Sequence, residues 1–204
     1  GYRNFEAPDA STNVSPWGII IGGEELHNNH HTYPTSAKLS VKWYEFDIGW
    51  LYIRLLEMAG LAKVRKTPPK LALGAVKPVA DGQTLQALIA NRYEVMAKYG
   101  AEMKRAVAAE VQRLKDLRLA QAWLHRDEDK IPPAVKPSLQ QALGESPSLA
   151  KLVAMREELR QLWTRTGVSA EQLVADLQAW CRKAEDSGIA ALQEFSFKLR
   201  AATA

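Results

Sequence analysis

Three of the four histidines in this 204-residue chain fall within five consecutive positions, and this cluster constrains the chain more than any other feature. His27, His30 and His31 have the spacing i, i+3 and i+4, which places three imidazole rings on one face of a helix. Imidazole is a strong ligand for iron and zinc at neutral pH. The clustering therefore favours a metal site over a polar surface helix whose histidines have no function.

Polar neighbours of the cluster are expected to support the rings. Asn28 and Asn29 could hydrogen-bond the imidazoles and fix their tautomers, and Glu24 could accept a hydrogen bond from a ring N–H. The remaining histidine, His125, is expected on a solvated helix end rather than at the metal. A histidine-rich site for two metals therefore needs carboxylates such as Glu24 or Asp47, or ligands from outside this sequence.

Composition divides the sequence into three parts. Residues 1–66 start with turn-forming residues and a short helix, and end in an aromatic and apolar stretch of helical length, for which Gly60 is a stop signal. Residues 67–83 form a basic linker that contains three prolines. Residues 84–204 keep the apolar spacing of helices, so they predict an α-helical extension.

Within this extension, the pattern predicts one long helix or two in series, followed by a second helical block. Ser146 and Ser169 are N-cap candidates, and Gln172 stands at the capping-box position after Ser169. Cys181 rules out an internal disulfide because it is the single cysteine, and its apolar neighbours place it in a core. The expected helical segments are 84–126, about 138–144, 146–166, 169–186 and 188–201.

The expected fold class is therefore all-α. A loop and a short helix with the histidine cluster come first, an amphipathic helix follows, and a helical hairpin or small bundle ends the chain.

The histidine cluster and its flanks resemble the third histidine box of integral-membrane fatty acid desaturases of the stearoyl-CoA, or delta-9, group. The run from Gly23 to Pro34, GEELHNNHHTYP, has the pattern G-E-x-x-H-N-x-H-H followed by an aromatic residue and proline. The stretch from Trp43 to Ala62 is similar to the amphipathic helix that follows the box in that family. The resemblance covers residues 1 to about 66 and implies that this is the carboxy-terminal part of the desaturase domain.

The resemblance implies an oxidoreductase of lipid metabolism and fatty acid biosynthesis. In that family, three histidine boxes at the ends of four membrane-spanning helices bind two iron ions, which activate O2 and introduce a double bond into an acyl chain. Carried over, His27, His30 and His31 are iron ligands. The acyl group would be carried by CoA or a lipid, and electrons would come from an external ferredoxin, rubredoxin or cytochrome-type donor. The first two boxes are not in these 204 residues, so the chain alone is expected to be inactive.

The stretch at residues 41–62 fits a membrane surface or a soluble core equally well by composition alone. Trp43, Tyr44, Trp50 and Tyr52 are aromatics of the kind found at membrane interfaces, and basic residues follow from Lys63 onward. The resemblance favours the membrane and places this part on the cytoplasmic face of an integral-membrane protein.

The last helices are similar to the carboxy-terminal helices of some bacterial transposases, over Trp180 to Leu192, and to helical extensions of some bacterial desaturases. The alternative function is therefore a helical nucleic-acid-binding or regulatory module. The net charge is only +4, and Lys and Arg alternate with Glu and Asp in these helices, which is typical of a solvated face. No convincing triad of catalytic carboxylates is evident, and no nucleic-acid partner is expected.

Overall fold

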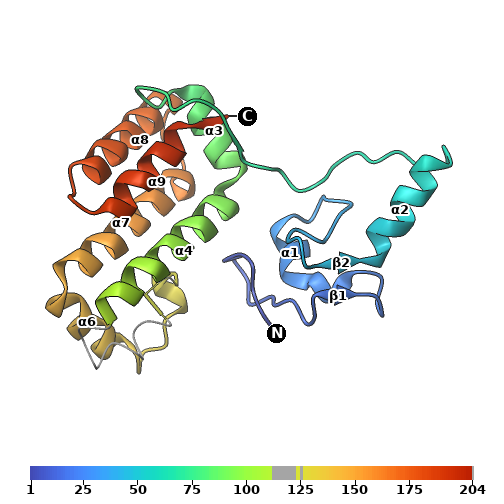
Figure 1. Cartoon of the computed structure of the whole chain (residues 1–204), viewed down its shortest axis with the longest axis horizontal. Helices are drawn as coiled ribbons and strands as arrows, with labels where there is room; N and C mark the ends of the chain where they lie inside the picture. The colour runs from blue at the N-terminus through green and yellow to red at the C-terminus, as the bar shows by residue number, and fades with distance from the viewer. Residues whose placement is uncertain (112–122, 125, 204) are drawn as a thin grey trace. The chain divides into compact units, whose positions relative to one another are not determined.

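The computed structural model describes residues 1–111, 123, 124 and 126–203 (Figure 1). Residues 112–122 of the expected helical stretch lie outside the described residues, as does His125. The described part is mostly helical, with a few short strands, which confirms the all-α fold class. The chain forms two compact units, Gly1–Lys70 and Leu71–Ala204.

The first unit is built from short elements joined by long loops. Its helix α1 contains all three clustered histidines, so the prediction that they share a helix is confirmed. A two-residue parallel pairing joins β1 to β2, with Trp17 opposite Phe46 and Gly18 opposite Asp47. The elements are β1 (Trp17–Gly18), the 3-10 helix η1 (Glu24–Leu26), α1 (His27–Thr32), β2 (Phe46–Asp47) and α2 (Ile48–Met58).

Gly23 is required at the entry to the histidine helix. Its φ of 103° lies in the left-handed region that side chains disfavour. A Cβ at this position would also lie 2.5 Å from Oδ1 of Asp47. Asp47 cannot easily move aside, because the same Oδ1 accepts a hydrogen bond from the Trp50 backbone N–H at 2.9 Å and so caps α2.

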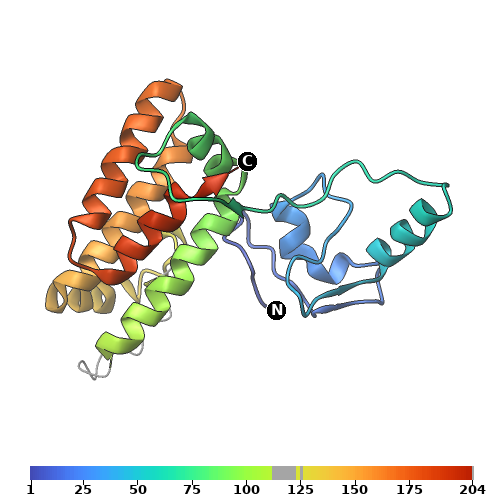
Figure 2. The same cartoon turned by 45° about the horizontal axis from the view of Figure 1, so that its top comes forward.

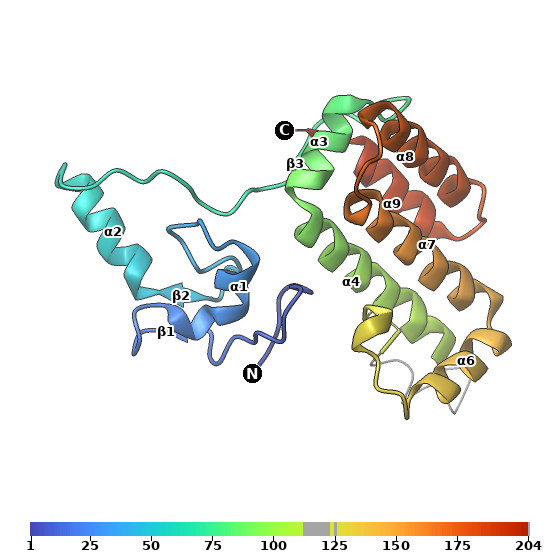
Figure 3. The ribbon, with the colours of Figure 1, turned by 180° about the vertical axis from the view of Figure 1, so that it is seen from behind.

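The second unit is a helical bundle closed by a small pair of strands. Helices α7, α8 and α9, orange to red in Figures 1 and 2, pack in succession, and α4 packs against α7 and α9. The short strands β3 and β4 pair antiparallel, and Figure 3 shows β3 beside α3. The elements are β3 (Ala72–Leu73), α3 (Gly82–Ala90), α4 (Arg92–Val111), η2 (Glu128–Lys130), α6 (Lys136–Glu145), α7 (Pro147–Thr164), α8 (Ala170–Glu185), α9 (Ala190–Arg200) and β4 (Ala202–Thr203).

The helix starts in this unit follow the predicted caps. The Ser146 hydroxyl accepts from the Leu149 N–H, and the Ser169 hydroxyl accepts from the Gln172 N–H, so both N-caps are confirmed. The capping box does not close, because the Gln172 side chain donates to Asp176 one turn further on.

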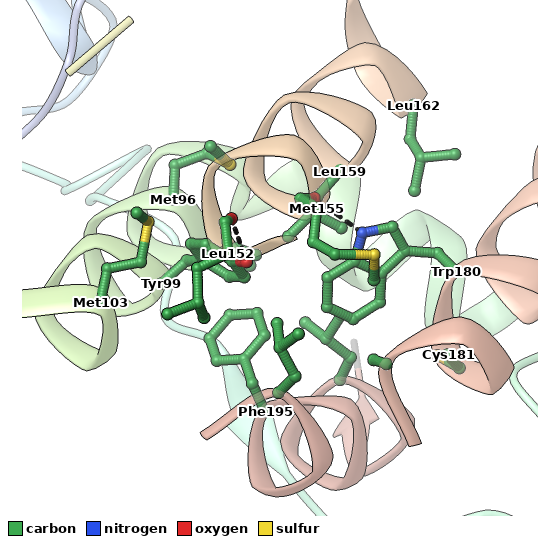
Figure 4. Packing of buried hydrophobic residues seen from close by; sticks show 14 of the residues in the cluster. Met96, Tyr99, Met103, Leu152, Met155, Leu159, Leu162, Trp180, Cys181 and Phe195 are labelled. Carbon is green, nitrogen blue, oxygen red and sulfur yellow. Dashed lines mark hydrogen bonds between the residues drawn. The ribbon is translucent and has the colours of Figure 1, made fainter. Parts of the chain in front are cut away.

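A cluster of edge-to-face aromatic rings lies in the core of the bundle (Figure 4). Tyr99 lies 5.0 Å from Phe195 and 6.3 Å from Trp180 between ring centroids. The polar atoms of two rings are satisfied by α7, because the Tyr99 hydroxyl donates to the Leu152 carbonyl and the Trp180 Nε1–H donates to the Met155 carbonyl, each at 2.8 Å. Trp180 is thus a core residue.

Part of the segment predicted as a linker lies along this bundle. The Gly74 N–H donates to the Ala201 carbonyl at 2.7 Å, and the Arg200 guanidinium donates to the carbonyls of Lys77 and Pro78. Ala80 is only 1% exposed. Several backbone groups between Gly74 and Ala80 are therefore hydrogen-bonded to the bundle, whereas residues 67–70 belong to the first unit.

Replacing Phe195 by alanine is expected to lower the free energy of unfolding of the second unit by about 3–5 kcal/mol, since it removes a buried ring from the aromatic cluster. Chemical denaturation followed by circular dichroism measures this change. Phe197→Ala on the same helix is the matched control. Its ring is 44% exposed and lies over Arg200, so the expected loss is below about 1 kcal/mol. Equal losses for the two variants would contradict this description of the core.

Candidate functional site

The three clustered imidazoles lie side by side on α1. The centroids of the His27 and His31 rings are 4.2 Å apart, and the His30 ring lies 6.3 Å from His27 and 5.8 Å from His31. His27 and His31 are exposed, and His30 is partly buried. The structure therefore brings together the three residues that the sequence predicted as metal ligands.

The helix that carries these rings is capped by a residue far away in sequence. Oδ1 of the fully buried Asn13 accepts from the backbone N–H groups of Asn28 and Asn29, at 2.9 and 3.2 Å. This carboxamide satisfies two of the first N–H groups of α1, which have no partner within the helix.

Asn28 fastens the helix to the amino-terminal segment. Its Oδ1 accepts from the backbone N–H groups of Asn4 and Phe5 at 2.9 and 3.0 Å, and its Nδ2 donates to the Phe5 carbonyl at 3.1 Å. Asn28 is fully buried, so each of these bonds replaces one to water.

Asn29 and Glu45 form a second connection from the helix to the loops. Asn29 Nδ2 donates to Glu45 Oε2 at 2.9 Å, and the same carboxylate oxygen accepts from the backbone N–H groups of Val41 and Lys42. The other oxygen of Glu45 accepts from the Tyr2 hydroxyl at 2.8 Å. Burial and then this bond to the carboxylate raise the pKa of Tyr2 above its ordinary value.

The predicted support for the rings is therefore placed differently by the structure. The hydrogen bonds of the Asn28 and Asn29 amides run to loops, because both side chains point into the unit from the face opposite the imidazoles. The carboxylate that does contact a ring is Asp9, whose Oδ2 lies 2.6 Å from Nδ1 of His31. No local sequence pattern indicates this contact, since the two residues are 22 positions apart.

Glu24, Glu25 and Asp47 differ in what they can offer a metal. Glu24 lies near the rings, with Oε2 4.0 Å from Nδ1 of His27. Buried Glu25 instead accepts hydrogen bonds from the Ile20 and Ile21 N–H groups. Burial raises the pKa of Glu25, but the backbone hydrogen bonds have the larger combined effect, so the pKa is lowered overall. Asp47 Oδ2 accepts from the Leu39 N–H and Oδ1 accepts from the Trp50 N–H, so both carboxylate oxygens of Asp47 are used in backbone hydrogen bonds.

The donor chemistry of the face fits iron, but the described residues do not complete a site. No group of three or more His, Cys, Asp or Glu side chains in the described part of the chain is arranged to hold a metal ion. Nδ1 of His30 is buried and has no hydrogen-bond partner among these residues. The three imidazoles thus share one face of α1, but the described residues do not arrange them into a metal site.

Helix α2 contributes no buried residue, so it is not a core helix of the first unit. Apolar side chains are also exposed in the preceding loop, where Trp43 is 95% exposed. No helix among the described residues is both long and apolar enough to cross a membrane. The exposed large apolar side chains of α2 are Leu51, Tyr52, Leu55, Leu56 and Met58.

Comparison with known proteins gives a family for the larger part of the chain. Residues 83–203, more than half of the sequence, match the model of a family described as transposase. The chain belongs to this transposase family. The similarity first noted at Trp180 to Leu192 is thus confirmed, and the match spans most of the helical bundle.

The same transposase-family chain also contains a desaturase-like region. It is 48% identical over 71 residues to sn-2 palmitoyl-lipid 9-desaturase of Nostoc sp. (strain 36), covering 34% of this chain and 25% of that protein. It is 41% identical over 73 residues to sn-1 stearoyl-lipid 9-desaturase of Synechocystis sp. (strain ATCC 27184 / PCC 6803 / Kazusa), covering 36% and 23%. It is 39% identical over 71 residues to Delta-9 desaturase-like 5 protein of Arabidopsis thaliana, covering 35% and 24%.

The chain therefore spans about a quarter of the length of these curated relatives. No solved structure matches the chain.

Replacing Asn28 by alanine is expected to raise the hydrogen-exchange rates of the Asn4 and Phe5 amides about 10-fold or more. The variant removes their shared acceptor, and an unsatisfied buried donor costs about 1–3 kcal/mol. Hydrogen exchange followed by mass spectrometry measures this change. His27→Ala, which removes an exposed ring from the same helix, should leave these rates unchanged. Unaltered exchange in Asn28→Ala would show that the amide does not hold the helix.

Proposed function

We propose that Gly1–Lys70 is the third-histidine-box part of a delta-9-type fatty acid desaturase. In this proposal the imidazole nitrogens of His27, His30 and His31 coordinate a centre of two iron ions. The remaining ligands come from outside the described residues. The complete centre would use O2, and electrons from an external ferredoxin, rubredoxin or cytochrome-type donor, to introduce a double bond into an acyl chain. The observation that carries the proposal is that three imidazoles share one face of a helix.

Three further observations support this assignment. The curated relatives are named as desaturases of lipid acyl chains, and the matched lengths of 71 and 73 residues are close to the extent of the first unit, Gly1–Lys70. The buried amides of Asn28 and Asn29 hold the helix that carries the rings, which restricts the motion of the proposed ligands. Neutral imidazole also suits iron well.

We also propose that α2 lies on the cytoplasmic face of the membrane. The helix exposes its apolar side chains, and no residue of it is buried against the rest of the chain. Burial of apolar side chains at the acyl boundary would remove them from water at about 25 cal/mol per Å². The basic residues that follow α2 could meet anionic headgroups. They are Lys63, Arg65, Lys66 and Lys70.

The isolated 204-residue chain is expected to bind ferrous iron weakly, at fewer than two ions per chain, and to turn over no acyl lipid. Three imidazoles cannot saturate two octahedral metals, so most ligands are missing. Anaerobic equilibrium dialysis measures the binding, and product analysis after incubation with O2 and a reduced ferredoxin measures turnover.

Alanine variants of His27, His30 and His31 should each weaken the binding of iron. His125→Ala is the matched control and should leave it unchanged, since the family pattern gives that histidine no ligand role. Stoichiometric binding of two irons by the unaltered chain, or an equal loss in the control, would contradict the proposed site.

A second candidate function concerns residues 83–203, because the transposase match falls there. These helices could form a nucleic-acid-binding module. The pairing of their charges speaks against this function, since a basic side chain that is held by a carboxylate neutralises a phosphate poorly. The ion pairs among the described residues of this part are Lys98–Glu94, Arg105–Glu102, Lys130–Asp127, Arg156–Asp127, Arg160–Glu157, Arg165–Asp176, Lys183–Glu158, Lys198–Glu102 and Arg200–Glu185.

A titration of the chain with double-stranded DNA by filter binding, at about 50 mM and 200 mM salt, tests this second function. We expect no salt-sensitive binding, because few phosphates would be neutralised. Binding that falls about 10³-fold or more between the two salt concentrations would require six or more phosphate contacts. That result would make the transposase-family part a nucleic-acid-binding module.

A further inference from the structure

The three imidazoles on α1 differ in what their Nδ1 atoms contact. Nδ1 of His31 lies 2.6 Å from Oδ2 of Asp9, which is a short hydrogen bond. Nδ1 of His27 lies 4.0 Å from Oε2 of Glu24, beyond hydrogen-bond reach, and Nδ1 of His30 has no partner among the described residues. His31 is therefore the one of the three whose ring a carboxylate holds directly.

We propose that Asp9 is a positioning residue that fixes the tautomer of His31 and so directs its Nε2 lone pair to the metal. The proposal rests on the proposed iron site and adds to it a residue outside the histidine box. An ionised carboxylate can only accept hydrogen bonds, so Nδ1 of His31 must carry the hydrogen. In a neutral imidazole the lone pair is then on Nε2, which becomes the atom able to bind a metal.

The loop around Asp9 is built to hold this carboxylate in place. Oδ1 of Asp9 accepts from the Ser11 backbone N–H at 2.9 Å, which leaves Oδ2 to face the ring. The Arg3 guanidinium donates to the backbone carbonyls of Ala7 and Asp9, each at 3.0 Å. These bonds connect the loop to the amino-terminal segment. The Ser11 backbone N–H and the His31 ring therefore contact different oxygens of the Asp9 carboxylate.

Because the two oxygens contact different groups, Asp9→Asn changes the contact with His31 and keeps the contact with Ser11. The asparagine keeps an oxygen for the Ser11 N–H and places an NH2 group, a donor, where Oδ2 faces His31. Nδ1 of His31 must then accept, so the ring hydrogen moves to Nε2 and occupies the atom needed by the metal. Asp9→Ala removes the partner entirely and should leave a mixture of the two tautomers.

Long-range proton–nitrogen NMR correlation of the metal-free, 15N-labelled full chain measures the tautomer directly. At a pH of about 8.5, where ordinary imidazole is neutral, His31 should carry its hydrogen on Nδ1 in the unaltered chain and on Nε2 in Asp9→Asn. The spectrum of His31→Ala identifies the signals. Glu24→Gln is the matched carboxylate control and should leave the His31 tautomer unchanged. The same tautomer in the unaltered chain and in Asp9→Asn would overturn the positioning role.

The affinity for ferrous iron separates this inference from the proposed function. Asp9→Asn should lower it about 10- to 100-fold, as is typical for partners of metal-bound histidines, and His31→Ala should lower it at least as much. Loss of affinity in His31→Ala but not in Asp9→Asn would overturn the role of Asp9 and leave the iron site standing. Unchanged affinity in both variants would overturn the proposed function itself.

Discussion

The position of the histidine helix α1 depends on the hydrogen bonds of two buried carboxamides, those of Asn28 and Asn29. Asn28 and Asn29 point away from the imidazoles into the unit, where burial without partners would cost about 1–3 kcal/mol for each unsatisfied group. The amino-terminal segment, the loop at Leu39 and the carboxylate of Glu45 supply those partners. A helix of only six residues is thereby fixed by bonds to distant loops, which its own length could not achieve.

The two units depend on different physical interactions. The first is organised by buried polar contacts and leaves much apolar surface exposed, as at α2. The second is organised by burial of aromatic and aliphatic side chains, with Tyr99, Trp180 and Phe195 in edge-to-face contact. The comparisons also have two parts, since a transposase family matches residues 83–203 and about a third of the chain is similar to desaturases.

Local patterns in the sequence predicted what depends on neighbouring residues. The i, i+3, i+4 spacing predicted one face for the histidines, and Ser146 and Ser169 predicted two helix starts, because caps act within three residues. Asn28 and Asn29 were expected to hydrogen-bond the rings, whereas in the structure their amides bond to Phe5, Leu39 and Glu45, which lie outside the histidine cluster in sequence. The contact of Asp9 with His31 could not be predicted, since the two residues are 22 positions apart in sequence.

The sequence by itself determined the helical class, the caps at Ser146 and Ser169, and the grouping of three histidine side chains on one face. Only the tertiary structure decided which face of α1 is buried, which carboxylate meets which ring, and that residues 71–82 lie along the bundle. The physical reason is the range of the interactions. Helix periodicity and capping act over a few residues, whereas hydrogen-bond partners such as Asn13 for α1 or Arg200 for Lys77 become neighbours only after the chain folds.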